Sequence, residues 1–249
     1  MNLEGKVAVV TGGTGGLGWR ICKNLAGAKM KVVLVYLNSA DTARQYVNEL
    51  ETSGTEAVAV QADVTTSDGI HKMKDEALAR FGALDALVLD AAFNQWVAFP
   101  DLEGLSPEIW DKIVNYNLTA PYLAMRIIGP LMKARGGGRI VTVTSIAGLA
   151  PTGSSIAYGV SKAGLIHLTR CMAVALAPSV LVNGVAPGTM EGTRMTANLS
   201  PAYVEKAMRS ALIQKAPDRD DVAGAIRLLI ETDSITGQNI VADGGIIFN

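Results

Sequence analysis

The sequence predicts an α/β fold in which helices cover both faces of a doubly wound, seven-stranded parallel sheet. Short apolar runs rich in Val, Ile and Leu alternate with longer stretches of helical periodicity along all 249 residues. These runs lack strict polar alternation, as expected for strands that are covered on both faces. No internal repeat or low-complexity linker interrupts the alternation. We therefore expect one domain over residues 1–249.

The elements follow one another in a regular order. The expected strands are Lys6–Thr11, Lys31–Tyr36, Ala57–Ala62, Leu84–Leu89, Arg139–Ser145, Val180–Val185 and Asn239–Ala242. Leu17, Ile21 and Leu25 recur every four residues and predict a helix after the first strand. A longer helix should run from Ile156 to Ala177, between Ser154/Ser155 and Pro178. Right-handed crossovers place the ligand crevice beyond the carboxyl ends of the strands, so functional residues should follow strands.

The charge balance argues against nucleic acid and membranes as partners. The 22 basic and 23 acidic residues form neither a basic stripe for phosphate backbones nor a polybasic segment for anionic lipid. The first apolar run is too short for a signal peptide or a membrane span, which predicts a cytoplasmic protein. Cys22 and Cys171 both fall on expected apolar helix faces, which predicts two core thiols and no disulfide.

The stretch TGGTGGLG connects the first strand to the first helix. Backbone N–H groups at a helix N-terminus can hold an anion, and glycine lets the backbone approach a pyrophosphate closely. Two registers fit, GxGxxG at Gly13, Gly15 and Gly18 and TGxxxGxG at Gly12, Gly16 and Gly18. A Rossmann-type dinucleotide site is therefore expected, with contacts from Gly12, Thr14, Gly15, Gly16, Leu17 and Gly18.

The end of the second strand bears on the choice of coenzyme. Tyr36, Asn38 and Ser39 stand where an NAD-specific enzyme usually places an acid on the ribose hydroxyls. Without that carboxylate a 2′-phosphate meets no repulsion, and Asn38 and Ser39 can donate hydrogen bonds to it. Lys29 and Lys31 precede the strand, so no basic residue obviously compensates. We favour NADP(H) over NAD(H), and a polar loop that tolerates NAD is the alternative.

Tyr158 and Lys162, in YGVSK, place a phenol and an ammonium group four positions apart on one face of the long helix. Neither group is an efficient acid or base near neutral pH unless its pKa shifts, and a cation within about 4–6 Å lowers the pKa of a tyrosine. Ser145, thirteen residues before Tyr158, is expected at the carboxyl end of the fifth strand, beside the crevice. An exposed helix pair is the alternative for the Tyr and Lys taken alone.

Together these motifs resemble the classical short-chain dehydrogenase/reductase family. The family pattern is TGxxxGxG, a serine thirteen residues before YxxxK, and a late PG. Here these stand as TGGTGGLG, Ser145, YGVSK and Pro187-Gly188, and the resemblance extends from Lys6 to the DGG at Asp243. It implies an NAD(P)(H)-dependent oxidoreductase that interconverts a small-molecule ketone and a secondary alcohol.

The resemblance also implies a role for each site residue. Tyr158 would be the general acid/base, and Ser145 would hold the substrate oxygen. Lys162 would bind the nicotinamide ribose and lower the pKa of Tyr158, and Asn117 would position a water for proton relay. The further cofactor contacts that it implies are Asp63 and Val64 at adenine, Asp90, Ala91 and Ala92 after the fourth strand, and Pro187, Gly188 and Thr189 beside the nicotinamide.

Two departures from the family pattern bear on the cofactor contacts. After the fourth strand the family usually has NNAG, whereas this chain has Leu89-Asp90-Ala91-Ala92. A carboxylate near a pyrophosphate is unfavourable, so we expect Asp90 to face a backbone amide or another donor. The threonine that the family places four residues after the PG glycine is here Gly192, and Thr193 follows it. Whether Thr193 reaches the cofactor is left open.

Other classes of protein fit the sequence less well. With only His71 and His167, and no GxSxG after a strand, a hydrolase would lack its base and its nucleophile. His, Cys, Asp and Glu nowhere gather with metal-ligand spacing, so no metal is expected. The remaining alternative is a catalytically silent dinucleotide-binding sensor or scaffold.

In the family, the region corresponding to residues 189–217 covers the substrate, and here it has too few strand signals to join the sheet. A bulky apolar, aromatic or acyl substrate is expected from the apolar side chains of this segment and of the one after the fourth strand. These are Met190, Met195, Leu199, Tyr203, Met208, Phe93, Trp96 and Phe99. The run VVLVYLNS resembles 3-oxoacyl-[acyl-carrier-protein] reductases and polyol or naphthol reductases, so these classes stay open. No basic patch is evident for an acidic carrier protein.

The chain ends on the apolar run Ile246-Ile247-Phe248-Asn249. An exposed apolar end is unfavourable, and members of the family bury it between subunits. We therefore expect a homotetramer, with a dimer as the alternative.

Overall fold

A computed structural model of the chain describes residues 1–197 and 199–248. Its strands form one seven-stranded sheet in the order β3-β2-β1-β4-β5-β6-β7, with every neighbouring pair parallel. The strands are β1 (Val7–Thr11), β2 (Lys31–Tyr36), β3 (Ala57–Gln61), β4 (Ala86–Leu89), β5 (Gly138–Val143), β6 (Val180–Pro187) and β7 (Asn239–Ala242). The strand order reverses between β1 and β4, which leaves a crevice at their carboxyl ends.

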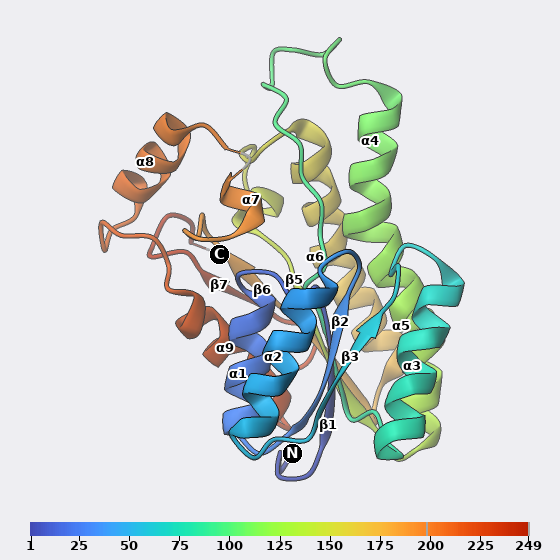
Figure 1. Cartoon of the computed structure of the whole chain (residues 1–249). Coiled ribbons are helices and arrows are strands. Elements are labelled where there is room, and N and C mark those ends of the chain that lie inside the picture. Colours follow the sequence, from blue (N-terminus) through green and yellow to red (C-terminus); the bar gives the residue numbers. More distant parts are fainter. Residues whose placement is uncertain (198, 249) are drawn as a thin grey trace.

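Helices cover both faces of this sheet, which confirms the predicted doubly wound Rossmann fold (Figure 1). Helices α1 (Gly18–Gly27), α2 (Ala40–Thr52) and α9 (Arg219–Glu231) lie on one face, and α3 (Ser67–Phe81), α5 (Ala120–Ala134) and α6 (Ile156–Leu176) lie on the other. Helices α4 (Pro107–Val114), α7 (Arg194–Ala197) and α8 (Pro201–Ser210) extend beyond the carboxyl ends of the strands. Two short turns complete the set, the π-helical η1 (Asn115–Thr119) and the 3₁₀ turn η2 (Ile146–Gly148).

Burial on both faces explains why the apolar runs form strands. In β1, Ala8 and Val10 pack with α1, α2 and α9, whereas Val7 and Val9 pack with the helices of the opposite layer. All four residues are at most 1% exposed. Such a strand has no solvent face, so its sequence carries no polar alternation.

Several element boundaries differ from the prediction by one to two residues. Strand β5 ends at Val143 and not at Ser145; Ser145 instead caps the turn η2, where its hydroxyl oxygen accepts the N–H of Ala147 at 3.2 Å. Ser145 still lies just past the carboxyl end of β5. Strand β6 continues to Pro187, which carries the sheet up to the PG turn.

The prediction of two core cysteines is wrong for Cys171. Cys22 is buried, but Cys171 is exposed on α6. Helix α6 carries a second apolar stripe on its outer side, where Val160 is 47% exposed and Val174 is 82% exposed. Because both faces of the helix are apolar, periodicity alone did not tell the inner face from the outer one.

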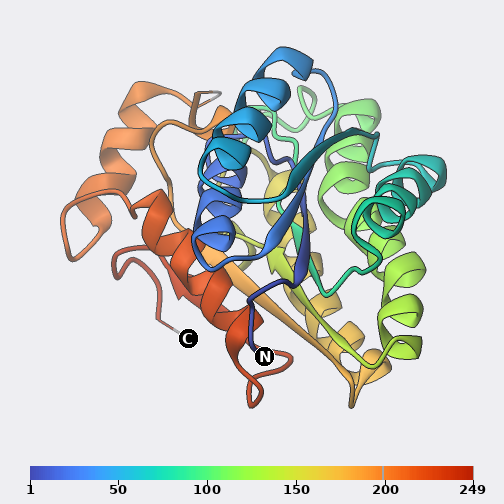
Figure 2. The same ribbon diagram turned by 60° about the horizontal axis from the view of Figure 1, so that its bottom comes forward.

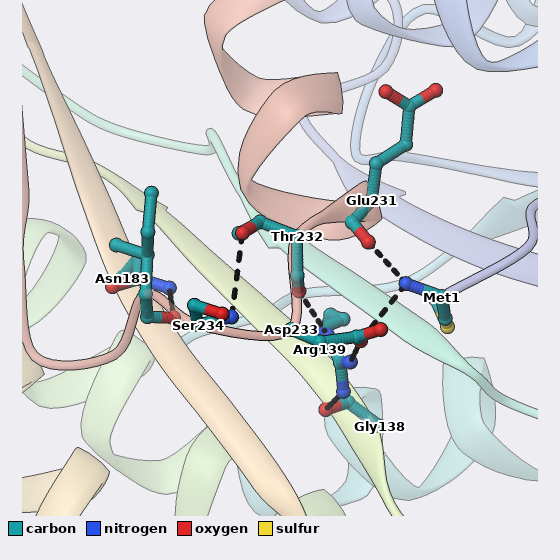
Figure 3. Close-up of polar contacts among 9 residues, drawn as sticks. Met1, Gly138, Arg139, Asn183, Glu231, Thr232, Asp233 and Ser234 are labelled. Atoms are coloured by element: carbon teal, nitrogen blue, oxygen red, sulfur yellow. Dashed lines mark hydrogen bonds and ion pairs between the residues drawn. The ribbon is translucent and has the colours of Figure 1, made fainter.

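The amino terminus lies beside the loop that follows α9 (Figure 2). The Met1 ammonium group donates to the carbonyl oxygen of Glu231 and pairs with Asp233 at 3.0 Å (Figure 3). Arg139 of β5 also contacts the Asp233 carboxylate, and its Nε donates to the Thr232 carbonyl oxygen at 3.2 Å. Hydrogen bonds from Met1 and Arg139 hold the pKa of Asp233 below its usual range. These contacts connect the chain start, β5 and α9 at the sheet edge away from the crevice.

None of the helices in the described part of the chain combines the length and the apolar character that a membrane crossing requires.

Candidate active site

A cavity of about 460 Å³ opens at the carboxyl edge of the sheet. Its walls come from the segments that follow β1 to β6, where the topology places a ligand crevice. The predicted site residues that line it are Gly12, Thr14, Gly15, Gly16, Leu17, Tyr36, Asn38, Ser39, Asp63, Val64, Asp90, Ala91, Ala92, Phe93, Ser145, Tyr158, Lys162, Pro187, Gly188 and Thr189. Five predicted residues are not among its lining residues: Gly18, Asn117, Trp96, Phe99 and Met208.

The glycine loop is shaped to receive an anion. The backbone N–H groups of Thr14, Gly16 and Leu17 donate no hydrogen bond within residues 1–197 and 199–248. They lie at the N-terminus of α1, which favours negative charge. A Cβ atom at Gly18 would lie 2.2 Å from the carbonyl oxygen of Gly12, so only glycine allows the loop to fold against the helix. This cradle fits the pyrophosphate of a dinucleotide.

The edge formed by β2 and β3 fits the adenosine half of such a ligand. Asn38 and Ser39 follow β2 and line the cavity, and no carboxylate stands beside them at that strand end. Asp63 follows β3, and its Oδ1 accepts hydrogen bonds from the N–H and the hydroxyl group of Thr65 at 2.9 and 2.7 Å. These bonds hold the Asp63 carboxylate at the rim of the cavity.

Asp90 lies between the glycine loop and Lys162. Its carboxylate accepts a hydrogen bond from the Gly18 N–H, which confirms the expected backbone donor. Burial raises the pKa of Asp90 to about 7, and the Lys162 ammonium and the Gly18 N–H oppose this rise. Burial likewise lowers the pKa of Lys162 to about 8, and Asp90 opposes that change. Each buried group is thus partly stabilised in its charged form by the other.

Replacing Asp90 with Asn should stabilise the fold more at pH 8 than at pH 5. Because the folded-state pKa is raised from 3.8 to about 7, the stability associated with a protonated Asp90 is lost as the pH rises through this window. Asn retains an acceptor for Gly18 and carries no charge. We expect the Tm to rise by a few degrees at pH 8 and by less at pH 5, measured by thermal unfolding. Equal shifts at the two pH values would contradict a buried charge at Asp90.

Ser145, Tyr158 and Lys162 meet on the β5 side of the cavity. Ser155 is the N-cap of α6, and its hydroxyl oxygen accepts the N–H of Tyr158 at 3.2 Å. This hydrogen bond holds the backbone of Tyr158 in the first turn of the helix. The Ser145 hydroxyl forms a hydrogen bond with the Tyr158 side chain. The Lys162 Nζ lies 5.8 Å from the centroid of the Tyr158 ring and donates to the Val143 carbonyl oxygen at 2.8 Å.

The pKa of Tyr158 is raised in this structure, and its lowering by Lys162 stays a prediction. Burial raises the pKa of Tyr158 to about 12, and the hydrogen bond with Ser145 opposes the rise. The Lys162 ammonium is turned to the Val143 carbonyl oxygen, a partner that the i, i+4 spacing does not reveal. At neutral pH Tyr158 is therefore a protonated phenol.

Asn117 lies outside the cavity and stabilises its wall by hydrogen bonds. It lies in η1, is 1% exposed, and its Oδ1 accepts the N–H of Phe93 at 2.9 Å. Its Nδ2 donates to the Phe93 carbonyl oxygen at 2.8 Å and to the Ser161 hydroxyl at 3.2 Å. The side chain thus connects the segment after β4 to α6. Its part in a proton relay stays a prediction.

An apolar wall forms the substrate side of the cavity. Phe93, Met190, Met195, Leu199 and Tyr203 line it, whereas Met208, Trp96 and Phe99 do not. The Tyr203 hydroxyl accepts the N–H of Gly153 at 3.1 Å and shares a 2.9 Å hydrogen bond with Thr152. Trp96 packs on Tyr203 in a T-shaped arrangement with ring centroids 5.4 Å apart, and it is 41% exposed. Trp96 thus lies behind Tyr203, and its contact with substrate stays a prediction.

Several lining residues escaped the sequence analysis. Among them are Asn94, Lys112, Tyr116, Thr144, Thr152 and Arg194. Lys112 and Tyr116 are one helical turn apart, a spacing that offered a signal, and the Lys112 Nζ lies 4.4 Å from the Phe93 ring centroid. Thr193 also lines the cavity, and its hydroxyl bonds to Thr196 at 3.1 Å within the segment 189–217.

Comparison with known proteins places this chain among dehydrogenases and reductases. A family model described as short chain dehydrogenase matches residues 6–204. The chain is 34% identical to the 3-oxoacyl-[acyl-carrier-protein] reductase of Synechocystis sp., with 98% of both chains covered. It is 32% identical to Dehydrogenase/reductase SDR family member 4 of Homo sapiens, over 98% of this chain and 88% of that protein. The crystal structure of the NADPH-dependent 3-quinuclidinone reductase from Rhodotorula rubra is similar, with a TM-score of 0.90, 26% identity and coverage of 98% and 92%.

Proposed function

The chain belongs to the short-chain dehydrogenase family and is an oxidoreductase that acts on CH–OH groups, and we propose that Ser145, Tyr158 and Lys162 perform this chemistry with NADP(H) as coenzyme. One observation carries the proposal. The hydroxyl, phenol and ammonium groups of these residues share the cavity that the anion-binding glycine loop also lines.

Each of the three side chains has a distinct part in the reduction of a ketone. When bound, the nicotinamide would supply the hydride. Tyr158 donates its phenolic proton to the substrate oxygen. Its raised pKa suits this role, because the phenol keeps its proton at neutral pH. Ser145 holds that oxygen by a hydrogen bond, and the buried Lys162 ammonium stabilises the phenolate that remains. In alcohol oxidation the same groups act in reverse.

The preference for NADP(H) over NAD(H) has support from the end of β2 and from a relative. Asn38 and Ser39 offer donors without a repelling carboxylate. The similar structure from Rhodotorula rubra is that of an NADPH-dependent reductase. We therefore propose that the 2′-phosphate lies at this strand end.

A ketone with a bulky apolar substituent suits the substrate side. Phe93, Met190, Met195 and Leu199 offer apolar surface, and the residue 189–217 segment would cover the bound molecule. A 3-oxoacyl thioester is our first choice, because the Synechocystis relative carries that activity in its name. Aromatic ketones follow, and the apolar wall makes polyols the least suited class.

A coenzyme and substrate screen tests the proposal. Purified protein is titrated with NADPH and NADH by fluorescence, and loss of reduced-coenzyme absorbance is followed with 3-oxoacyl thioesters and aromatic ketones. Polyols are tested with the oxidised coenzymes. We expect faster turnover with NADPH and a 3-oxoacyl or aromatic ketone. Tight coenzyme binding without turnover on any substrate would favour the silent sensor, and turnover restricted to polyols would contradict the proposed substrate class.

We also propose a homotetramer, because two separate apolar areas face solvent in the single chain. One is the outer stripe of α6, with Val174 82% exposed, and the other contains Leu212, Ile213 and Phe248, which are 73%, 53% and 77% exposed. Burying both areas by twofold contacts would give four subunits. Of the predicted C-terminal run, Asn249 lies outside the described residues.

Replacing Val174 with Glu should convert the tetramer into dimers. A buried, unpaired carboxylate would break the α6 contact and leave the second area intact, so light scattering should give the mass of four chains for the wild type and of two for V174E. The control K72E adds a carboxylate to the exposed face of α3 and should keep four chains. A wild-type monomer would contradict the proposal.

A further inference from the structure

The segment that covers the substrate side also reaches the opposite end of the cavity. Arg194 begins α7, and its Nη2 donates to the Ser39 hydroxyl at 3.0 Å. The two residues are separated by 155 positions in the chain, yet both line the cavity. A guanidinium group from residues 189–217 therefore lies at the end of β2, where sequence alone shows no basic residue.

This guanidinium group is not neutralised by the protein. Within residues 1–197 and 199–248, Arg194 forms no ion pair. The nearby acid of α2, Asp41, is paired with Arg44. The other cations that line the cavity are engaged elsewhere, Lys162 by the Val143 carbonyl oxygen and Lys112 over the Phe93 ring. Arg194 thus offers an uncompensated charge beside two hydrogen-bonding side chains, Asn38 and Ser39.

The residues before and after Arg194 are held in place by hydrogen bonds of their backbone carbonyl groups. Before it, the Gly192 carbonyl oxygen accepts from Arg219 Nη1 at 3.0 Å and lies so close to Gly16 that a Cβ atom there would be 2.2 Å away. After it, the Met195 carbonyl oxygen accepts from Asn94 Nδ2 at 3.0 Å. When the segment lies against the glycine loop in this way, the Arg194 side chain extends along the rim toward Ser39.

We propose that Arg194 and Ser39 together bind the 2′-phosphate of NADP(H), so that this phosphate draws the covering segment closed. The inference rests on the proposed function, because it concerns the same coenzyme. A guanidinium group makes strong, charge-assisted hydrogen bonds to a phosphate dianion. The Ser39 hydroxyl, which accepts from Arg194, keeps its own proton to donate to the phosphate. NADP(H) selectivity would then arise from the covering segment and not from β2 alone.

The test compares ligands that differ by the 2′-phosphate. The probes are NADPH against NADH, and adenosine 2′,5′-bisphosphate against adenosine 5′-monophosphate, titrated into the wild type, R194M, S39A and R209M. The loss of charge-assisted bonds should raise the Kd of R194M for both 2′-phosphorylated ligands by about 10-fold to 100-fold. S39A should show a smaller rise. The Kd values for NADH and the monophosphate should stay nearly constant in both variants.

R209M is the matched control. Arg209 lies on α8 of the same segment, is 79% exposed at its side chain and pairs with Glu205 at 2.6 Å. Its replacement removes one positive charge without touching the cavity rim, so all four Kd values should match those of the wild type.

Closure of the segment is measured separately by amide hydrogen exchange over residues 190–197. The bisphosphate should slow exchange there in the wild type and not in R194M, whereas the monophosphate should have no effect in either protein. Equal protection by the two nucleotides would overturn closure by the 2′-phosphate.

The outcomes also separate this inference from the proposed function. An unchanged NADPH affinity in R194M, or equal weakening of NADPH and NADH, overturns the role of Arg194 alone. A wild type that binds NADH as tightly as NADPH overturns this role and the coenzyme preference, and leaves the oxidoreductase assignment intact. A wild type that binds neither dinucleotide overturns the proposed function and this inference with it.

Discussion

Replacing Tyr158 with Phe is expected to lower turnover by on the order of 10³-fold while NADPH binding stays nearly constant. The change removes one oxygen atom and leaves the ring, which the Ser155 cap and the start of α6 hold in place. The proton donor is lost, but the glycine loop and the Asn38 and Ser39 side are untouched. Steady-state rates and fluorescence titrations on the same samples measure the two quantities.

A matched control for this variant is Tyr122→Phe on α5. Tyr122 is 44% exposed and is not among the cavity-lining residues, so loss of its hydroxyl group should leave turnover unchanged. Nearly full activity in Y158F would remove Tyr158 from the mechanism. A parallel loss of NADPH binding would instead indicate that the phenol supports the shape of the site.

Replacing Lys162 with Met should lower turnover by about 10²-fold to 10³-fold and also weaken NADPH binding. Its effect on the Tm should be less favourable at pH 8 than at pH 5. At pH 8 Asp90 loses the cation that opposes the burial-driven rise of its pKa, whereas at pH 5 Asp90 is largely protonated in the folded protein and loses little, and at both pH values the buried Lys162 charge, whose own pKa is lowered to about 8, is removed. Thermal unfolding at the two pH values measures this difference.

The double variant D90N/K162M separates the catalytic part of Lys162 from its structural part. With the buried carboxylate gone, the missing ammonium group no longer leaves an uncompensated charge, so the Tm at pH 8 should return to or above the wild-type value. Turnover should remain low, because no cation supports the Tyr158 phenolate. Recovery of turnover together with stability would show that Lys162 acts only through folding.

The parts of the site that sequence could predict are those that local pattern and strand order determine. Ser145 and the glycine loop follow strands, and parallel strands bring their carboxyl ends to one edge. Tyr158 and Lys162 share a helix face by spacing alone. A hydrogen-bond donor to the Asp90 carboxylate was also predictable, because a buried carboxylate requires one, although the sequence did not show which backbone N–H it would be.

The features that escaped prediction depend on where side chains end in three dimensions. The raised pKa of Tyr158 follows from burial, and the Lys162 ammonium turns toward the Val143 carbonyl oxygen; spacing encodes neither feature. Cys171 lies on an outer apolar stripe that periodicity cannot tell from an inner one. Arg194 reaches Ser39 because residues 189–197 fold against the glycine loop, and the path of such a segment has no signature in its composition.

The position of Arg194 next to Met195 has a consequence for evolution and for engineering. Arg194 contacts the rim beside Ser39 and Met195 lines the apolar wall, so a short stretch of chain belongs to both the proposed coenzyme side and the proposed substrate side. A mutation selected for a larger substrate at Met195 would displace its neighbour and alter coenzyme choice as a side effect. Libraries that broaden the substrate range of such an enzyme should therefore be selected with both coenzymes present, because substitutions in this stretch are expected to change substrate preference and coenzyme preference together.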